Sequence, residues 1–166
     1  MCDMIFHMGK RVLLKKRFVL KEHHATRLHY DFRVERSGIA VSWAIPKGLS
    51  MNPSETRLAI SVPDHPLSSL DFVGTRRKGL YGAGEVATWD RGQYTAFSIN
   101  DMKILIILYG RKLRGAFLLQ RKHLNSRDWF ITKTNDEYAD PKFVVKPILK
   151  PRKHKGFEPL LDDLDD

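Results

Sequence analysis

Cysteine is almost absent from this sequence of 166 residues: Cys2 is the only one, so no disulfide can form within the chain and a Cys-rich zinc site is excluded. Long apolar runs are also missing. The longest unbroken aliphatic run, Ile104 to Leu108, has five residues, whereas a membrane-spanning helix needs about 20. The first 16 residues carry charge throughout, which argues against a secretory signal. We therefore expect no membrane partner and a cytoplasmic, reducing location.

Acidic residues are scarce over most of the chain. The sequence has 19 Asp and Glu against 29 Lys and Arg, a formal net charge of +10. Five of the acids fall in residues 158–166, so residues 1–157 carry +15. A body this basic favours a polyanionic partner such as nucleic acid. The alternative is a basic surface that serves only solubility.

Composition divides the chain into three zones. Residues 1–16 are a short basic extension, and residues 17–138 contain the periodic apolar segments that predict the folded domain. Residues 139–166 hold four of the eight prolines, a stretch of six Lys or Arg between 142 and 155, and the acidic end. Prolines at this spacing preclude a long helix and disfavour a central strand. We expect a partly extended tail whose acidic end can fold back on basic surface.

A period of two dominates residues 17–138, as is typical of β-strands. Residues 29–35 alternate polar and apolar, and Ser37-Gly38 then turns the chain into a second strand, 39–45. Further strands are expected at 57–62, 86–89, 93–97, 104–109, 116–121 and 129–134, with a hairpin turn at 90–92. The pattern predicts an all-β protein with short helical turns. We expect a compact, closed or nearly closed β-barrel of seven to eight strands, with a sandwich as the alternative.

The densest group of reactive side chains lies between His23 and Arg33. On a strand, residues two apart share a face, so His29, Asp31 and Arg33 project together. His23 can join them from the preceding loop or strand. Two imidazoles and one carboxylate form a three-ligand set with open positions, suited to Mn²⁺, Fe²⁺ or Zn²⁺.

The position of Arg33 beside a cation site suggests a shared anion. A metal and a guanidinium can hold the same phosphate, which explains why both occur on one strand face. The alternative is an amphipathic strand with a solvated polar face and surface histidines, because polar-out alternation is common. The mixture of side chains favours a site.

Three other features carry less information on their own. Arg57 lies off the apolar face of its strand, and His65 lies in Asp64-His65-Pro66, where the proline stiffens the backbone. Either residue alone would more often be structural or merely exposed. The glycine-rich segment 79–84 precedes a strand-like segment, whereas a dinucleotide-binding loop requires a helix there. A tight connection between strands is the better interpretation.

Several of these motifs occur together, in order, in one family. The segment 18–35 and Ser42-Trp43-Ala44-Ile45-Pro46-Lys47-Gly48 resemble the 3′-phosphoesterase domain of bacterial DNA ligase D, which also occurs as a free-standing protein. The resemblance continues through 57–59, 64–67, 71–72, 81–84 and 89–92 and reaches weaker matches at 110–115 and 129–133. It covers residues 17–135.

The resemblance implies a β-barrel and a manganese-dependent enzyme that removes a 3′-phosphate or a terminal 3′-ribonucleoside from DNA ends, leaving a 3′-hydroxyl. Zn²⁺ or Co²⁺ can occupy such a site as well. The implied substrate is a DNA primer-template with a 3′-phosphate or 3′-ribonucleotide end. A DNA ligase or other end-joining proteins are the implied partners, and we expect a monomer. By resemblance, the metal ligands are His23, His29 and Asp31, the phosphate-binding arginines are Arg33 and Arg57, and the second essential histidine is His65.

The sequence departs from the family pattern at three places. Ser69 stands where the family has a tyrosine, Pro63 stands where it often has an acid, and its N-terminal Arg-Asp element is not recognisable in residues 1–16. We expect these losses to affect ribonucleoside removal more than phosphate removal, and Ser69→Tyr to raise activity if space permits. A catalytically weakened DNA-end-binding module is the alternative.

A non-haem iron oxygenase is a second rival, because it also uses two histidines and a carboxylate. Its second histidine usually lies far downstream of the His-x-Asp pair. The close upstream position of His23 and the paired arginines argue against it.

Overall fold

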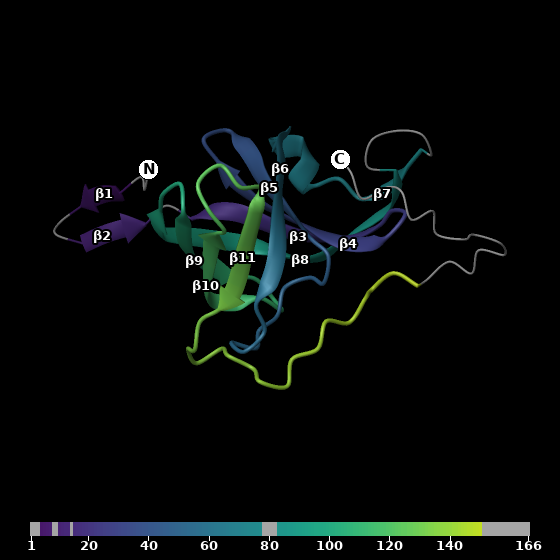
Figure 1. Ribbon diagram of the computed structural model, residues 1–166. Coiled ribbons are helices and arrows are strands. Elements are labelled where there is room, and N and C mark those ends of the chain that lie inside the picture. The colour runs from purple at the N-terminus through teal and green to yellow at the C-terminus, as the bar shows by residue number, and fades with distance from the viewer. Residues whose placement is uncertain (1–3, 8–9, 14, 78–82, 151–166) are drawn as a thin grey trace.

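The computed structural model describes residues 4–7, 10–13, 15–77 and 83–150 (Figure 1). Within these residues the chain forms strands and one short 3-10 helix, η1, and no α-helix. In this part of the chain, no helix has the length and apolar character needed to cross a membrane. The elements are β1 (Met4–His7), β2 (Lys10–Leu13), β3 (Lys16–His24), β4 (Leu28–Arg36), β5 (Ile39–Ile45), β6 (Arg57–Pro66), η1 (Leu67–Leu70), β7 (Gly74–Arg76), β8 (Gly84–Ile99), β9 (Lys103–Tyr109), β10 (Arg114–Arg121) and β11 (Asp128–Lys133).

Eight of the strands close into an antiparallel barrel. Their order is β3-β4-β5-β6-β11-β10-β9-β8, and β3 pairs with β8 to complete the ring. The short strand β7 is hydrogen-bonded to β8 outside this ring. β1 and β2 lie in the predicted basic extension and form a separate two-stranded sheet, apart from the barrel in Figure 1. The expected all-β barrel is confirmed, and the β3–β8 pairing excludes the sandwich.

The barrel interior is filled by the apolar half of each alternating strand. On β4 the side chains of Tyr30, Phe32 and Val34 are buried, as the period of two predicted. Trp43 stacks on Phe32 at 6.0 Å between ring centroids and meets the Trp129 ring edge-on at 6.1 Å. Aromatic pairs in these arrangements add to the stabilisation that burial of their area already gives. The other face of β4 is therefore available for polar side chains.

The hairpin predicted around Ser37-Gly38 is present. Both residues have positive φ, 51° and 80°, as a two-residue turn between twisted antiparallel strands requires. The strand predictions at 104–109, 116–121 and 129–134 are confirmed by β9, β10 and β11. In these elements the alternation and the glycine turns point to the same structure.

The predicted hairpin turn at residues 90–92 is wrong, because β8 is one continuous strand of 16 residues. Asp90 is buried, and its carboxylate accepts the backbone N–H groups of residues 111–113 in the β9–β10 loop. At Gly92 a Cβ atom would collide with the Tyr109 carbonyl oxygen on the paired strand. Both residues permit close approach between strands rather than a reversal of the chain.

Strand β3 shows no alternation of polar and apolar residues that would predict it, because both of its faces are buried. Six consecutive side chains, residues 18–23, are buried. Phe18, Leu20 and Glu22 face the barrel interior, while Val19, Lys21 and His23 lie on the outer face, where Val19 packs against η1. The structure therefore places His23 on a strand, one of the two positions that the sequence left open for it.

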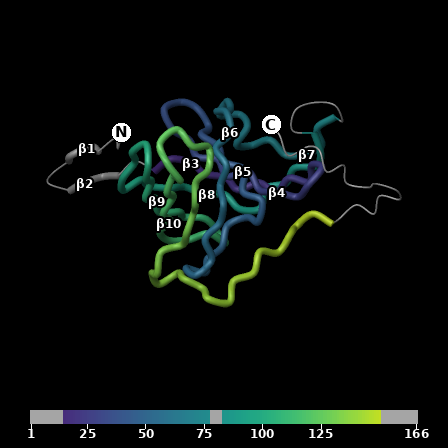
Figure 2. The backbone as a smooth tube through the Cα atoms, in the orientation of Figure 1, coloured from purple at the N-terminus to yellow at the C-terminus, as the bar shows by residue number. Residues whose placement is uncertain are grey.

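The C-terminal strap, which we define as residues 139–150, is extended and lies along one end of the barrel (Figure 2). Its Phe143 and Val145 pack against the core. The indole Nε1 of Trp89 donates to the Lys146 carbonyl oxygen at 2.9 Å. The strap contains turns at residues 141–142 and bends at 148–149 and no regular strand or helix. Residues 78–82 and 151–166 lie outside the described part, so the predictions for the glycine-rich connection and for the acidic end stay predictions.

Candidate metal and phosphate site

The register between β3 and β4 brings the predicted metal ligands together. His23 lies directly opposite His29, and Lys21 lies directly opposite Asp31. Directly opposed residues of an antiparallel pair project from the same face of the sheet. The four side chains therefore form one polar group on the outer face of the barrel, opposite the face that carries Tyr30 and its apolar neighbours.

The side chains of this triad converge. His23 Nδ1 lies 3.3 Å from Asp31 Oδ2, and His29 Nε2 lies 3.3 Å from Asp31 Oδ1. The two imidazole rings are 4.6 Å apart. One ligand atom from each residue lies within 4.8 Å of the others, a spacing that a single metal ion can bridge.

Backbone carbonyls orient both imidazoles. His23 Nε2–H donates to the Ala83 carbonyl oxygen at 3.1 Å, and His29 Nδ1–H donates to the Arg27 carbonyl oxygen at 3.3 Å. With a proton held on the remote nitrogen, the nitrogen nearest Asp31 either donates to the carboxylate, when the imidazole is protonated, or presents a lone pair to a metal ion. Such carbonyl contacts are typical of metal-binding histidines. The donor set, with two nitrogens and one carboxylate, fits Mn²⁺, Zn²⁺ or Co²⁺.

The electrostatics keep Asp31 ionised. Burial raises the pKa of Asp31, but its hydrogen bonds with His23 and His29 and the charge of Arg33 lower it by more, so the pKa lies well below its usual range. Burial lowers the pKa of His29, yet the hydrogen bond and charge of Asp31 raise it overall. A cation at this position is therefore stabilised, whether it is a proton or a metal ion.

Arg33 follows the triad on the same face of β4 and is buried. Its Nη1 donates to the Ser69 carbonyl oxygen at 3.4 Å. Lys21, only 1% exposed, donates through Nζ to the Ser69 and Phe72 carbonyl oxygens. Two cations thus fix the segment around η1 beside Asp31.

A β-bulge brings His65 to the same face. The β5–β6 register shifts between Ala40 and Ser42, so that His65 lies opposite Ala40. Ser42 in turn lies opposite Arg33. Burial and the charge of Arg33 lower the pKa of His65, which favours the neutral imidazole. The extra residue of a bulge often re-aims a side chain in this way.

Two buried polar atoms near Arg33 have no hydrogen-bond partner among the described residues. They are His65 Nδ1 and Ser69 Oγ. Buried polar atoms are nearly always paired, so an unpaired one calls for an explanation such as an absent ligand or water. Both atoms fit the edge of a site that receives a polar substrate group.

The structure does not join Arg57 to the triad by any described contact. Its Nη2 lies 2.6 Å from Glu55 Oε2. On β6, Arg57 lies opposite the core residue Ile131, two residues before the buried Ala59. Its phosphate-binding role, which rested on the resemblance, stays a prediction.

Sequence reasoning missed two cations. Lys21 is two residues before His23 on β3, so the period of two that grouped the β4 residues would have found it had β3 been identified. Arg76 is on β7, and its charge acts on both His65 and Lys21. No local signal distinguishes it from its neighbour Arg77, because only the pairing of β7 with β8 brings it to the site.

Comparison with known proteins gives the family of this chain. The sequence profile of the DNA Ligase D 3′-phosphoesterase domain matches residues 21–121, a range that contains all six predicted site residues. The chain belongs to this family.

Curated relatives carry the same domain within longer chains. The Multifunctional non-homologous end joining protein LigD of Pseudomonas aeruginosa is 42% identical over 130 residues, which are 74% of this chain and 16% of that protein. The protein of that name from Mycobacterium bovis is 45% identical over 108 residues, 63% of this chain and 14% of the relative. The Mycolicibacterium smegmatis relative is 39% identical over 133 residues, which are 73% of this chain and 17% of that protein. The chain spans about a sixth of the length of these relatives.

Proposed function

We propose that this chain is a manganese-dependent DNA 3′-phosphoesterase. It removes a terminal 3′-phosphate, and more slowly a terminal 3′-ribonucleoside, to leave a 3′-hydroxyl that a ligase or polymerase can use. The observation that carries the proposal is the convergence of His23, His29 and Asp31 beside Arg33. Membership of the 3′-phosphoesterase family and the end-joining names of its relatives support the choice of DNA ends as substrate.

The metal is held by the triad in this proposal. Mn²⁺ at His23, His29 and Asp31 would supply Lewis acidity toward a non-bridging phosphate oxygen. The ionised state of Asp31 and the carbonyl-oriented imidazoles favour such an ion. Other divalent transition metals suit the same donors.

The cationic side chains act on the phosphate. Arg33 neutralises charge on the non-bridging oxygens, and more strongly as charge builds up in the transition state. Lys21 keeps the η1 segment in place through the Ser69 carbonyl oxygen. Neutral His65, whose Nδ1 has no described partner, donates a hydrogen bond to the phosphate or its leaving oxygen. No described side chain lies at the triad as an evident covalent nucleophile, so water is the attacking group.

Release of inorganic phosphate tests the proposal. A DNA primer-template with a 3′-phosphorylated primer is incubated with the purified protein, with and without Mn²⁺. We expect phosphate release that depends on the metal and is lost in Asp31→Asn, while a 5′-phosphorylated primer of the same sequence is not processed. Asp101→Asn, an exposed carboxylate outside the site, serves as the matched control.

The alternative, a DNA-end-binding module of the same fold, predicts a different result. It would bind the primer-template yet release no phosphate with any divalent metal. The absence of the family tyrosine at Ser69 is the observation that favours this alternative. Binding and release measured on one preparation separate the two.

A further inference from the structure

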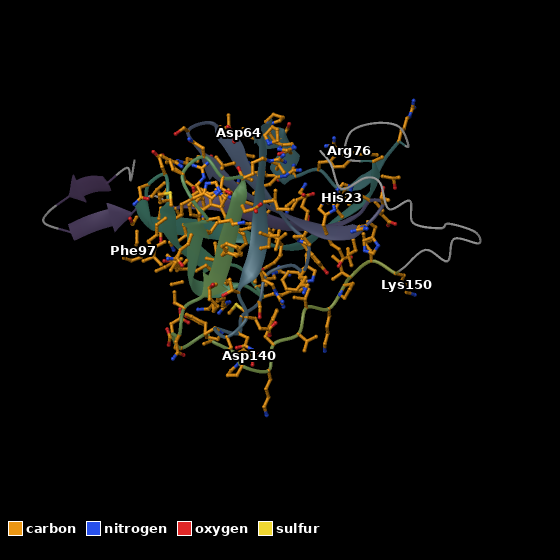
Figure 3. All side chains as sticks on the ribbon, in the orientation of Figure 1. His23, Asp64, Arg76, Phe97, Asp140 and Lys150 are labelled. Carbon is orange, nitrogen blue, oxygen red and sulfur yellow. The ribbon has the colours of Figure 1, made fainter. Side chains whose placement is uncertain are left out.

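Strand β7 carries one arginine to the face of the triad. Gly74 lies opposite Val86 on β8, and Val86 lies opposite His23 on β3. Because opposed residues share a face and residues two apart do as well, Arg76 projects from the same face as His23. Figure 3 shows these two labelled residues on the same side of the molecule.

The β7 position in register with His23 carries no side chain. Gly74 is the β7 residue in register with His23, and a Cβ atom there would meet nothing within 4 Å. Neighbouring strands are about 4.8 Å apart, so β7 lies two strand spacings, about 10 Å, from β3. A long side chain is needed to act across this distance, and arginine is long enough.

The guanidinium of Arg76 is held in place without an anion. Its Cζ lies 4.7 Å from the centre of the Phe72 ring. The Phe72 carbonyl oxygen accepts from Lys21 Nζ, so the same residue joins both cations. Among the described residues no carboxylate pairs with Arg76. By contrast, Arg17 pairs with Asp71 at 3.3 Å and Arg57 pairs with Glu55.

The charges around this position are unbalanced. Lys21, Arg33 and Arg76 share this side of the barrel with two carboxylates, Asp71 and Asp31, and Asp71 already pairs with a fourth cation, Arg17. Like charges brought together at a partly buried site destabilise the protein unless an anion joins them. One terminal phosphate at the triad and Arg33 would leave Arg76 still without an anionic partner among the described residues, because β7 is set back from the proposed metal ligands.

We propose that Arg76 binds the phosphodiester next to the reacting 3′ group and so positions the DNA strand. The inference rests on the proposed function and extends it to a second phosphate subsite. A cation about two strands away from the triad reaches the neighbouring phosphate of the strand rather than the terminal one. In this chain Ser69 stands where the family has a tyrosine. Through its contact with the DNA, Arg76 supplies part of the substrate positioning that the tyrosine would otherwise give.

A binding cycle tests the contact directly. Two 3′-phosphorylated primer-templates are compared by fluorescence anisotropy, one natural and one with an uncharged methylphosphonate at the phosphodiester next to the 3′ end. Wild-type protein and Arg76→Gln are each titrated with both. We expect the neutral linkage to weaken wild-type binding by about tenfold, a typical effect for a charged hydrogen bond. Arg76→Gln should weaken binding to the natural DNA by the same factor. Its affinity should fall no further when the DNA carries the neutral linkage.

Two further variants separate positioning from general charge or folding. Arg77→Gln removes the same charge from an adjacent exposed residue and should weaken binding by less than threefold on either DNA. Arg76→Lys should recover part of the binding while its circular dichroism matches that of the wild type. In phosphate release, Arg76→Gln should raise KM and leave kcat within about twofold.

The outcomes separate the Arg76 contact from the proposed catalysis. Two results would overturn the Arg76 contact alone. In the first, Arg76→Gln and Arg77→Gln weaken DNA binding equally. In the second, the loss of affinity caused by Arg76→Gln multiplies the loss caused by the neutral linkage. Wild-type protein that binds DNA but releases no phosphate overturns the proposed catalysis, and the binding cycle still decides the role of Arg76. Wild-type protein that does not bind the primer-template overturns both.

Discussion

His23 lies directly opposite His29 in the antiparallel pairing of β3 with β4, although the two are six residues apart in the chain. Their rings are 4.6 Å apart, with Asp31 within 3.3 Å of each. A short hairpin that reverses at residues 25–27 is therefore enough to bring the three proposed metal ligands together. The site depends on the register of two strands and on few loops, which makes it stiff before any ligand binds.

The first prediction concerns Asp31. We expect Asp31→Asn to abolish Mn²⁺ binding in isothermal titration calorimetry and to lower phosphate release at least 100-fold, because the amide carries no charge and leaves two imidazoles as ligands. The variant should remain folded, since Asp31 lies on the outer face of the barrel. Retention of Mn²⁺ affinity within threefold of the wild type would mean that the metal binds elsewhere.

The second prediction concerns Arg57. Because its guanidinium pairs with Glu55 at 2.6 Å, we expect Arg57→Gln and Glu55→Gln to lower the free energy of unfolding by a similar amount, about 1 kcal/mol. If Arg57 also binds the substrate phosphate, as the resemblance implies, phosphate release should fall at least tenfold in Arg57→Gln and stay within about threefold of the wild type in Glu55→Gln. Urea unfolding and steady-state kinetics measure the two effects. Unchanged phosphate release in both variants would contradict the phosphate-binding role and leave Arg57 as a structural partner of Glu55 alone.

The third prediction concerns Lys21, whose pKa is lowered to about 8 by burial and by the charge of Arg33. Between pH 8 and the pKa of 10.5 of an unfolded lysine, the unfolded chain binds more protons than the folded one, so stability rises with pH. The cost of burying the charge is fully present below pH 8 and is on the order of 3 kcal/mol. Relative to Lys21→Met, the metal-free wild type should therefore become more stable from pH 8 to pH 10. A difference in unfolding free energy that stays constant with pH would show that the amine is not the titrating group.

The fourth prediction concerns Ser69, which is 5% exposed and holds η1 through its carbonyl oxygen. The expected gain of activity in Ser69→Tyr depended on space, and the buried side chain leaves little. We expect Ser69→Tyr to lower the free energy of unfolding by about 1–3 kcal/mol through overpacking. It should raise neither phosphate release nor ribonucleoside removal. Thermal unfolding and the two end-healing assays report on this. A stable variant with faster ribonucleoside removal would mean that η1 moves to admit the ring.

The alternation from His29 to Glu35 was sufficient to predict one strand, its buried face and half of the site. Strand β3 could not be found in this way, because both of its faces are covered and alternation vanishes from its sequence. Gly92 was misinterpreted for a related reason: a glycine that admits a neighbouring backbone and a glycine that makes a turn are identical in sequence. Arg76 could not be predicted at all, since its position depends on β7 pairing across β8.

The carboxylate of Glu22 has a consequence for the order in which the protein assembles. It is fully buried next to His23 and accepts the backbone N–H groups of Ile148 and Leu149 at 2.8 and 2.7 Å. On the ribosome, the strap emerges after every barrel strand, so this buried charge lacks those two partners while the barrel first closes. A nascent chain that has released residues up to 138 holds the complete triad sequence beside a buried carboxylate that keeps Tyr30 and His24 as partners but lacks the two backbone N–H groups, which destabilises it. Completion of the proposed metal site is thus tied to the synthesis of a segment that supplies none of its proposed ligands.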